Sequence, residues 1–223
     1  MSYFSNQSDD DVTISTAKEA LLSKLSAIQL GYFQDEFSTH FCGGMVAPKK
    51  PPIINRGYFA RVQCINAALK QFEDHCKQLE LLSSQIVILG GGYDSLSLNI
   101  LKSGRTDVTI FDVDFPEIIQ RKTSLILSKA PLKAAVLPPG HPDASKVSFP
   151  QSSGSVTILG QLRLLPIDMR QCDDLCSMLL SSSFDPALPT LIISECVLVY
   201  IPTDDVTRLV ERSDPPTYRS CTI

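Results

Sequence analysis

The sequence lacks the features that mark membrane, secreted and nucleic-acid-binding proteins. Its 223 residues contain no uninterrupted apolar stretch long enough to cross a bilayer. Where a secretory signal would be basic and then apolar, the chain carries the acidic run Asp9-Asp10-Asp11. The formal net charge of -4 gives no general electrostatic attraction to nucleic acid. We therefore predict a cytoplasmic protein that needs no membrane and, on charge alone, no nucleic acid.

Paired metal-binding cysteines are also missing. The seven cysteines are an odd number, and without a secretory signal they indicate reduced thiols. Cys172 and Cys176 lie one helical turn apart, but no CxxC pair or nearby histidine accompanies them. We expect these thiols to be core or surface residues, and we predict no metal site.

The length and composition suit one domain with one core, since 43% of the residues are hydrophobic. Residues 1–15 are polar, serine-rich and acidic, which predicts a disordered N-terminus. An amphipathic helix is predicted from Thr16 to Leu30, with Lys24 on or beside its apolar face. Periodicity alone favours a solvated Lys24 whose stem covers the core.

The most informative stretch is a strand, a glycine turn, a helix and a second strand. Ile86 to Leu89 is an apolar run typical of a strand buried on both faces, and three glycines, Gly90 to Gly92, end it. A second β-branched run, Val108 to Val113, completes a βαβ unit. Asp112 and Asp114 stand at its far end, where both carboxylates can face the crevice in which open parallel sheets bind ligands.

This arrangement favours a nucleoside-type ligand over an ordinary tight turn. Glycines without Cβ let a ligand approach the main chain, and an acid at the next strand end can accept both ribose hydroxyls. In a G-x-G-x-x-G reading, Gly90 and Gly92 fit but Ser95 replaces the third glycine. The pattern thus favours S-adenosylmethionine over a dinucleotide, whose pyrophosphate needs a cradle.

Arginines supply a further candidate. Asn55 to Arg61 leads into a helix and places Arg56 and Arg61 beside Tyr58 and Phe59. A guanidinium fork matches the oxygens of a carboxylate, so the arginines are candidates for a carboxylate clamp. Surface salt bridges are an equally good interpretation of the residues alone.

Two more acids follow predicted strands. Asp168 comes after the apolar run that ends at Ile167, where it can accept from an adenine amino group or simply begin a turn or helix. Glu195 follows the buried run Leu191 to Ile193. A carboxylate among apolar residues needs a partner, which can be a sulfonium, an α-amino group or a local Lys or Arg.

Together these segments resemble the leucine carboxyl methyltransferases. The resemblance covers residues 20–205 and rests on Ser23-Lys24, Gly31-Tyr32, Ile54 to Arg61, Leu89 to Asp94, Asp112 to Pro116 with Arg121-Lys122, and Pro189 to Tyr200. It implies a Rossmann-like α/β fold with a parallel sheet flanked by helices, and S-adenosylmethionine as cofactor. The family's cofactor-binding positions fall on Lys24, Arg61, Gly90, Asp114, Asp168, Met169 and Glu195.

The resemblance also implies a reaction and a partner. The family esterifies the C-terminal leucine carboxylate of the protein phosphatase 2A catalytic subunit, and a carboxylate nucleophile needs no general base because it is already ionised. Positioning and desolvation then carry the catalysis. We expect Arg56 and Tyr200 to place the incoming carboxylate. The same motifs resemble the tRNA wybutosine-synthesising carboxymethyltransferase, which would make tRNA the alternative partner.

The end of the sequence departs from the family pattern. Residues 16–211 are interpreted as an incomplete methyltransferase domain that lacks its C-terminal strands, and residues 212–223 as a tail without family likeness. The strand at Leu191 would then lie at the edge of the sheet, which is an aggregation liability. We expect most of a cofactor pocket, low stability and no measurable turnover. A non-catalytic regulator that keeps the cofactor fold is the alternative.

Overall fold

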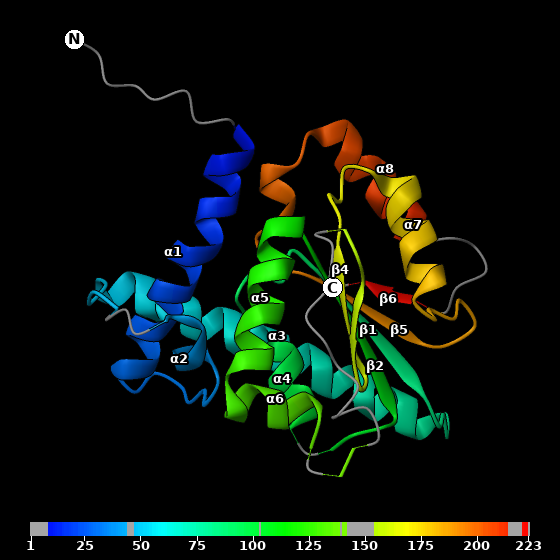
Figure 1. Ribbon diagram of the computed structural model, residues 1–223, viewed down its shortest axis with the longest axis horizontal. Coiled ribbons are helices and arrows are strands. Elements are labelled where there is room, and N and C mark those ends of the chain that lie inside the picture. Colours follow the sequence, from blue (N-terminus) through cyan, green and yellow to red (C-terminus); the bar gives the residue numbers. More distant parts are fainter. Residues whose placement is uncertain are drawn as a thin grey trace.

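The computed structural model describes residues 9–43, 47–102, 104–138, 140–141, 154–213 and 220–222. Helices surround one sheet with strand order β3-β4-β2-β1-β5-β6 (Figure 1). The strands are β1 (Ser84–Leu89), β2 (Val108–Asp114), β3 (Thr157–Leu159), β4 (Leu162–Pro166), β5 (Thr190–Ser194) and β6 (Ser220–Thr222). The helices are α1 (Asp9–Gln29), α2 (Ser38–Phe41), α3 (Pro52–Gln78), α4 (Leu96–Leu101), α5 (Pro116–Ser128), α6 (Ala130–Val136), α7 (Cys172–Ser181) and α8 (Thr203–Ser213). A short 3-10 helix, η1, spans Leu198–Tyr200.

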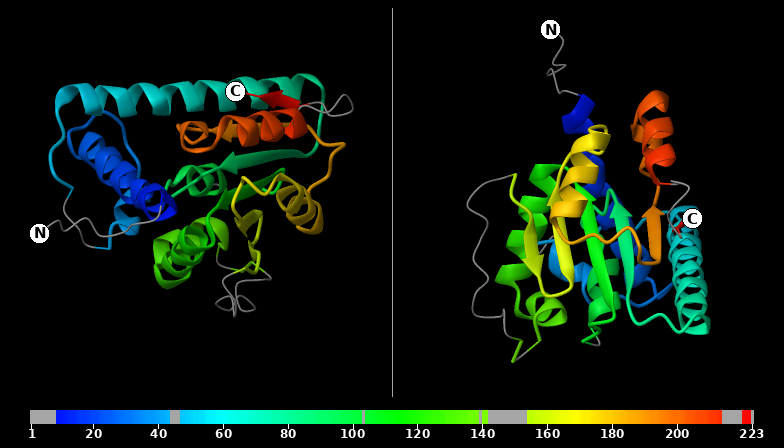
Figure 2. Two further views of the ribbon diagram at one scale, coloured as in Figure 1. Left: turned by 90° about the horizontal axis from the view of Figure 1, so that it is seen from above. Right: turned by 90° about the vertical axis from the view of Figure 1, so that its right-hand side faces the viewer.

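The predicted α/β fold class is confirmed. β1 pairs in parallel with β2 and β5, and β2 pairs in parallel with β4, whereas β3 is antiparallel to β4. Helices lie on both sides of the sheet (Figure 2). The ordering follows from the βαβ units seen in the sequence, because parallel neighbours need a crossover that covers a sheet face.

Both faces of β1 are buried, as its continuous apolar run predicts. Ile86 and Ile88 belong to one core cluster, which also contains side chains of α1, α3, α5 and α6. Val87 and Leu89 project to the opposite face and join a second cluster with side chains of α7 and α8. Successive strand residues point to opposite faces, so one apolar run supports two core layers.

The first helix begins earlier than the sequence predicts. α1 starts at Asp9 rather than Thr16, so residues 9–15, expected to be disordered, are helical. The hydroxyl of Ser15 donates to the Val12 carbonyl at 2.7 Å, and that of Thr16 donates to the Thr13 carbonyl at 2.6 Å. These hydroxyls bond to the helix's own backbone, which composition does not reveal. Residues 1–8 lie outside the described residues.

The prediction that the strand at Leu191 lies at the sheet edge is wrong. β6 pairs with β5 in parallel, with Leu191 opposite Cys221. β6 belongs to the segment that was interpreted as a tail without family likeness. Without a neighbour, β5 would leave a row of backbone donors and acceptors unpaired on one side. The three extended residues of β6 pair with part of that row.

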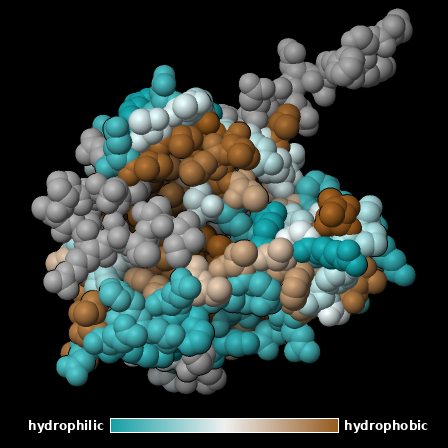
Figure 3. Space-filling view, turned by 180° about the vertical axis from the view of Figure 1, so that it is seen from behind, coloured by the Kyte–Doolittle hydropathy of each residue, from teal (hydrophilic) through white to brown (hydrophobic). Residues whose placement is uncertain are grey.

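The surface is not uniformly polar. Seen from behind, apolar side chains gather in one area above a hollow, and hydrophilic side chains dominate below it (Figure 3). Among the described residues the strongly exposed apolar side chains include Ile53, Leu82 and Val199. No described helix is both long enough and apolar enough to pass through a bilayer.

Candidate functional site

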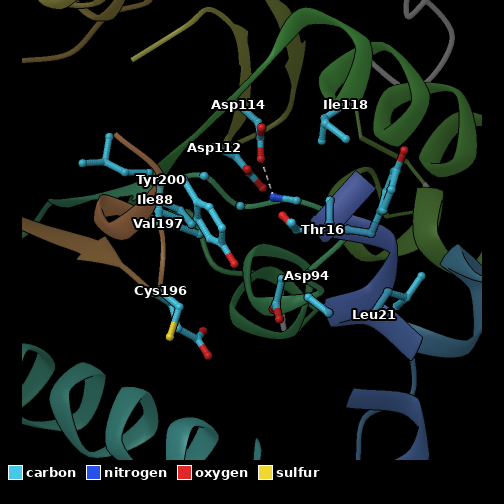
Figure 4. A pocket seen from close by; sticks show the side chains of 18 of the residues that line it. Thr16, Leu21, Ile88, Asp94, Asp112, Asp114, Ile118, Cys196, Val197 and Tyr200 are labelled. Atoms are coloured by element: carbon cyan, nitrogen blue, oxygen red, sulfur yellow. Dashed lines mark hydrogen bonds between the residues drawn. The ribbon is translucent and has the colours of Figure 1, made fainter. Parts of the chain in front are cut away.

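A cavity of about 380 Å³ opens at the carboxyl ends of the parallel strands. Leu89 pairs with Val113 on one side and with Ser194 on the other, so Gly90, Asp114 and Glu195 follow at one level. The side chains of Asp112 and Asp114 approach from β2, and Tyr200 approaches from η1 (Figure 4). The volume lies within the roughly 300–1,000 Å³ of small-molecule pockets.

The structure brings almost all of the sequence-predicted site residues together. The cavity is lined by the proposed cofactor-binding residues Lys24, Arg61, Gly90, Asp114, Asp168, Met169 and Glu195, and by Tyr200. Arg56 is the exception, because it is exposed on α3 and does not line this cavity. It lies two residues before Tyr58, the first residue of α3 that lines the cavity.

The glycine turn packs closely against the Val197 side chain. Gly90 adopts a φ of 68°, in the left-handed region, and a Cβ at this position would lie 2.4 Å from a methyl carbon of Val197. The amide of Gly90 donates to the Val113 carbonyl at 2.8 Å, which ties the turn to the end of β2. A side chain at Gly90 would therefore displace Val197 and alter the cavity wall.

Asp114 is held by main-chain donors. The amide of Gly92 donates to its Oδ2 at 2.7 Å (Figure 4), and the amide of Phe115 donates to its Oδ1 at 2.7 Å. Burial raises the pKa of the Asp114 carboxyl to about 6, against the lowering effect of these two hydrogen bonds. Asp114 therefore changes charge near pH 6.

This pKa predicts a pH dependence of stability. Because the folded-state pKa of Asp114 is raised from 3.8 to about 6, its protonated form stabilises the fold below about pH 4, and that contribution is lost as the pH rises through 6. The loss corresponds to about 3 kcal/mol at most. We expect the urea-unfolding free energy of the parent, relative to that of Asp114→Asn, to decrease as the pH rises from 4 to 6. A carbon-13 titration that places the Asp114 pKa below 4.5 would contradict the prediction.

Asp112 and Lys122 form a fully buried ion pair below the turn. The Lys122 Nζ lies 2.6 Å from Asp112 Oδ2, and both side chains are 1% exposed. The second oxygen, Oδ1, has no hydrogen-bond partner among the described residues, and it lies where a Cβ on Gly91 would be only 2.1 Å away. The turn thus packs directly on this carboxylate.

Lys24 lies in a buried cluster, and the interpretation as a solvated lysine is wrong. Its Nζ lies 2.8 Å from Asp94 Oδ2 and 3.3 Å from Asp35 Oδ2. Burial opposes the charge of Lys24, but the two carboxylates outweigh it and raise the pKa of the ammonium. Burial likewise opposes the charge of Asp35, yet Lys24 and the hydroxyls of Ser95 and Ser38 lower its pKa to about 2.

Arg61 and Glu195 meet each other across the cavity wall. The Arg61 Nε lies 2.6 Å from Glu195 Oε1, and the guanidinium stacks 4.7 Å from the ring centre of Tyr58. Burial opposes the charge of Arg61, whereas Glu195 raises its pKa. The salt-bridge interpretation of Glu195 therefore describes this structure, although its partner is 134 residues away in sequence. About a third of each side chain stays exposed, so both remain accessible to a ligand.

Asp168 also has a partner. The Arg170 side chain donates to both of its carboxylate oxygens, at 3.0 and 2.8 Å from Nε, and the Arg170 amide donates to Oδ1 at 2.9 Å. Asp168 thus organises the turn before α7, as one of the two interpretations predicts. The neighbouring Met169 is buried at the same cavity.

Sequence reasoning missed the counter-charges of the site. No sequence pattern pairs Asp35 or Asp94 with Lys24, and the Arg121-Lys122 motif by itself indicates no role for Lys122. A signal for Lys122 exists: it falls at helical spacing between Ile118 and Ile126 on the apolar side of α5. A lysine in that position indicates a buried acid opposite.

The described part of the chain shows neither a metal-binding cluster nor a disulfide bond. It contains no group of three or more His, Cys, Asp or Glu side chains that is arranged to hold a metal ion. The six cysteines whose side chains are described are free thiols.

Comparison with known proteins gives a consistent picture. A family model described as leucine carboxyl methyltransferase matches residues 12–214. Leucine carboxyl methyltransferase 1 of Bos taurus is 31% identical over 207 residues, which cover 91% of this chain and 58% of that protein. The corresponding homolog of Arabidopsis thaliana is 30% identical over 203 residues, 89% of this chain and 56% of that protein. The tRNA wybutosine-synthesizing protein 4 of Homo sapiens is 32% identical over 200 residues, 87% of this chain and 27% of that protein. The chain therefore spans little more than half the length of the leucine carboxyl methyltransferases it resembles.

Proposed function

This chain belongs to the leucine carboxyl methyltransferase family, and on that premise we propose that it methylates a carboxylate with S-adenosylmethionine as methyl donor. The observation that carries the proposal is the convergence of residues 24, 61, 90, 114, 168, 169 and 195 on one cavity. Apart from the adjacent residues 168 and 169, these positions are far apart in sequence, and the fold brings them to one cavity.

The volume and the lining side chains of the cavity support this cofactor. Gly90 and Val197 both line it, and they pack so closely that a Cβ at Gly90 would lie 2.4 Å from a Val197 methyl carbon, so this wall accommodates only backbone at Gly90. Carboxylates stand at three strand ends, and they supply acceptors for the hydroxyl and amino donors of the cofactor. Two of them, Asp168 and Glu195, already pair with arginines in this structure. The bound cofactor supplies an electrophilic methyl group with a thioether as leaving group.

Each residue has a role in this proposal. Asp114 would accept the ribose hydroxyls, for which its carboxylate must be ionised. Arg61 would hold the carboxylate of the cofactor through its guanidinium fork. Glu195 would pair with the positive charge of the cofactor, on its sulfonium or its α-amino group. Asp168 and Met169 would contact the adenine, and Lys24 would support the amino acid end. Cofactor binding would then replace part of the Arg61–Glu195 ion pair.

The proposed substrate is a protein C-terminus, namely the terminal leucine carboxylate of the protein phosphatase 2A catalytic subunit. Its carboxylate is ionised at neutral pH, so the chain needs to position it and exclude water rather than remove a proton. Tyr200 is half-exposed and lines the cavity, which supports a place at the substrate entrance. Arg56 is exposed on α3 outside the lining, so its role would have to be exerted at the outer rim.

Calorimetry with S-adenosylmethionine tests the cofactor assignment. We expect the chain to bind, and we expect Asp114→Asn to raise the Kd about 10–100-fold, because a hydrogen bond to a charged group is lost. Asp74→Asn, which changes an exposed carboxylate in α3, is the matched control and should leave the Kd unchanged. Equal affinities of the parent and Asp114→Asn would exclude the assigned role.

Methyl transfer tests the substrate. The proposed substrate predicts transfer of labelled methyl groups to a peptide that ends in a leucine carboxylate, but not to the same peptide with a C-terminal amide. Such transfer would overturn the expectation of no measurable turnover that the sequence gives. One other function has specific support. The similarity to the tRNA wybutosine-synthesizing protein supports a tRNA substrate, which would show as transfer to tRNA. Binding of the cofactor without transfer to either substrate would instead be the result for a non-catalytic regulator.

A further inference from the structure

The ion pair between Asp112 and Lys122 lies directly below the glycine turn. Asp112 belongs to β2 and Lys122 to α5, and both line the cavity wall while being 1% exposed. Neither belongs to the residues to which the proposed function gives a role in cofactor binding. A buried ion pair is weak evidence of a stabilising role, because apolar residues of similar volume often serve equally well.

The contacts of this pair point to the turn. The Lys122 Nζ lies 2.6 Å from Asp112 Oδ2 and 3.5 Å from the Gly91 carbonyl oxygen. The other carboxylate oxygen, Asp112 Oδ1, is in contact with Gly91, where a Cβ would be 2.1 Å away. The ammonium and the carboxylate therefore both contact Gly91.

Gly91 connects the pair to the proposed cofactor-binding acid. The next amide, that of Gly92, donates to Asp114 Oδ2 at 2.7 Å. Asp112 and Asp114 project from the same strand, two residues apart, so one supports the turn and the other receives its hydrogen bond. A shift of Gly91 would move the Gly92 amide away from Asp114.

We propose that Asp112 and Lys122 are positioning residues that fix the glycine turn, so that the Gly92 amide orients Asp114 for cofactor binding. The effect on cofactor affinity rests on the proposed function, whereas the effect on the turn does not. The pair acts through Gly91 and touches no reacting group.

Four variants separate this role from a merely structural one. Lys122→Met and Asp112→Asn each leave one buried partner without its counter-charge, and both are expected to lower the Tm. The double variant Asp112→Asn/Lys122→Met removes both charges, so most of the Tm should return. Ile126→Val, in the same helix and the same core, is the control that lowers the Tm without touching the pair.

Hydrogen exchange of the Gly92 amide in the unliganded protein is the first readout, and the Kd for S-adenosylmethionine is the second. In the double variant we expect the Gly92 amide to exchange about tenfold faster or more and the Kd to stay about tenfold higher, although the Tm has recovered. In Ile126→Val both readouts should equal those of the parent.

The proposal would be overturned if the double variant recovered the Gly92 protection and the Kd of the parent along with the Tm. The pair would then serve only to balance each other's charge. If single variants do not fold, the double variant still decides. A parent that binds no S-adenosylmethionine would contradict the proposed function, whereas the exchange of Gly92 would still decide the positioning role.

Discussion

Replacing Lys24 by methionine is expected to lower the free energy of unfolding at pH 7 by about 3–5 kcal/mol, as for a buried ion pair that loses one partner. The substitution leaves Asp35 and Asp94 close together and without their shared cation. Asp35 is 4% exposed in its side chain, so water cannot replace the lost partner. Urea unfolding of the parent and the variant measures the difference.

The difference in unfolding free energy between the parent and Lys24→Met should depend on pH. The pKa of Asp35 is lowered from 3.8 to about 2, so the stability it contributes is present above about pH 4 and is lost as the pH falls towards 2. The gap between parent and Lys24→Met should therefore be widest at neutral pH and narrow below pH 4. Lys70→Met removes an exposed lysine of α3 and serves as control. A gap that stays constant from pH 7 to pH 3 would contradict the assigned ion pair.

Replacing Gly91 by alanine is expected to destabilise the protein by about 3 kcal/mol, because the added Cβ overpacks the turn and disturbs a buried ion pair. The Cβ would lie 2.1 Å from Asp112 Oδ1, and this carboxylate cannot move away while Lys122 holds its other oxygen. For a chain of this size each kcal/mol corresponds to about 2–4 °C in Tm. Thermal unfolding followed by circular dichroism checks the shift.

Gly57→Ala is the matched control for this substitution. Gly57 lies in α3, and a Cβ there meets no heavy atom within 4 Å. Alanine is favoured over glycine inside a helix by up to about 1 kcal/mol, so the Tm should stay the same or rise. A Gly91→Ala variant as stable as Gly57→Ala would show that the turn tolerates a side chain and that Asp112 is not fixed beneath it.

Local patterns were sufficient to predict the centre of the fold. The run Ile86 to Leu89 and the three glycines after it predict a buried strand and a turn, and the structure has both. The order of the elements predicts the parallel pairing of β1 with β2, and the acids at strand ends were placed at one edge. These features depend on neighbours in sequence, where periodicity and backbone sterics decide the outcome.

Contacts between distant segments were not predictable in this way. The partners of Lys24 come from the loop after α1 and the turn after β1, and Glu195 meets Arg61 from the far end of the chain. The pairing of β6 with β5 was likewise missed, since three residues carry no periodic signal. In each case the partner is selected by the packing of whole elements.

The sequence by itself determined the class of the sheet, the position of the glycine turn and the residue types that gather around the cavity. The tertiary structure alone decided which charges neutralise one another: Lys24 with Asp35 and Asp94, Asp112 with Lys122, and Arg61 with Glu195. The reason is that strand and helix periods are local properties of the chain, whereas the stability of a buried charge depends on groups that folding brings within a few ångström of it.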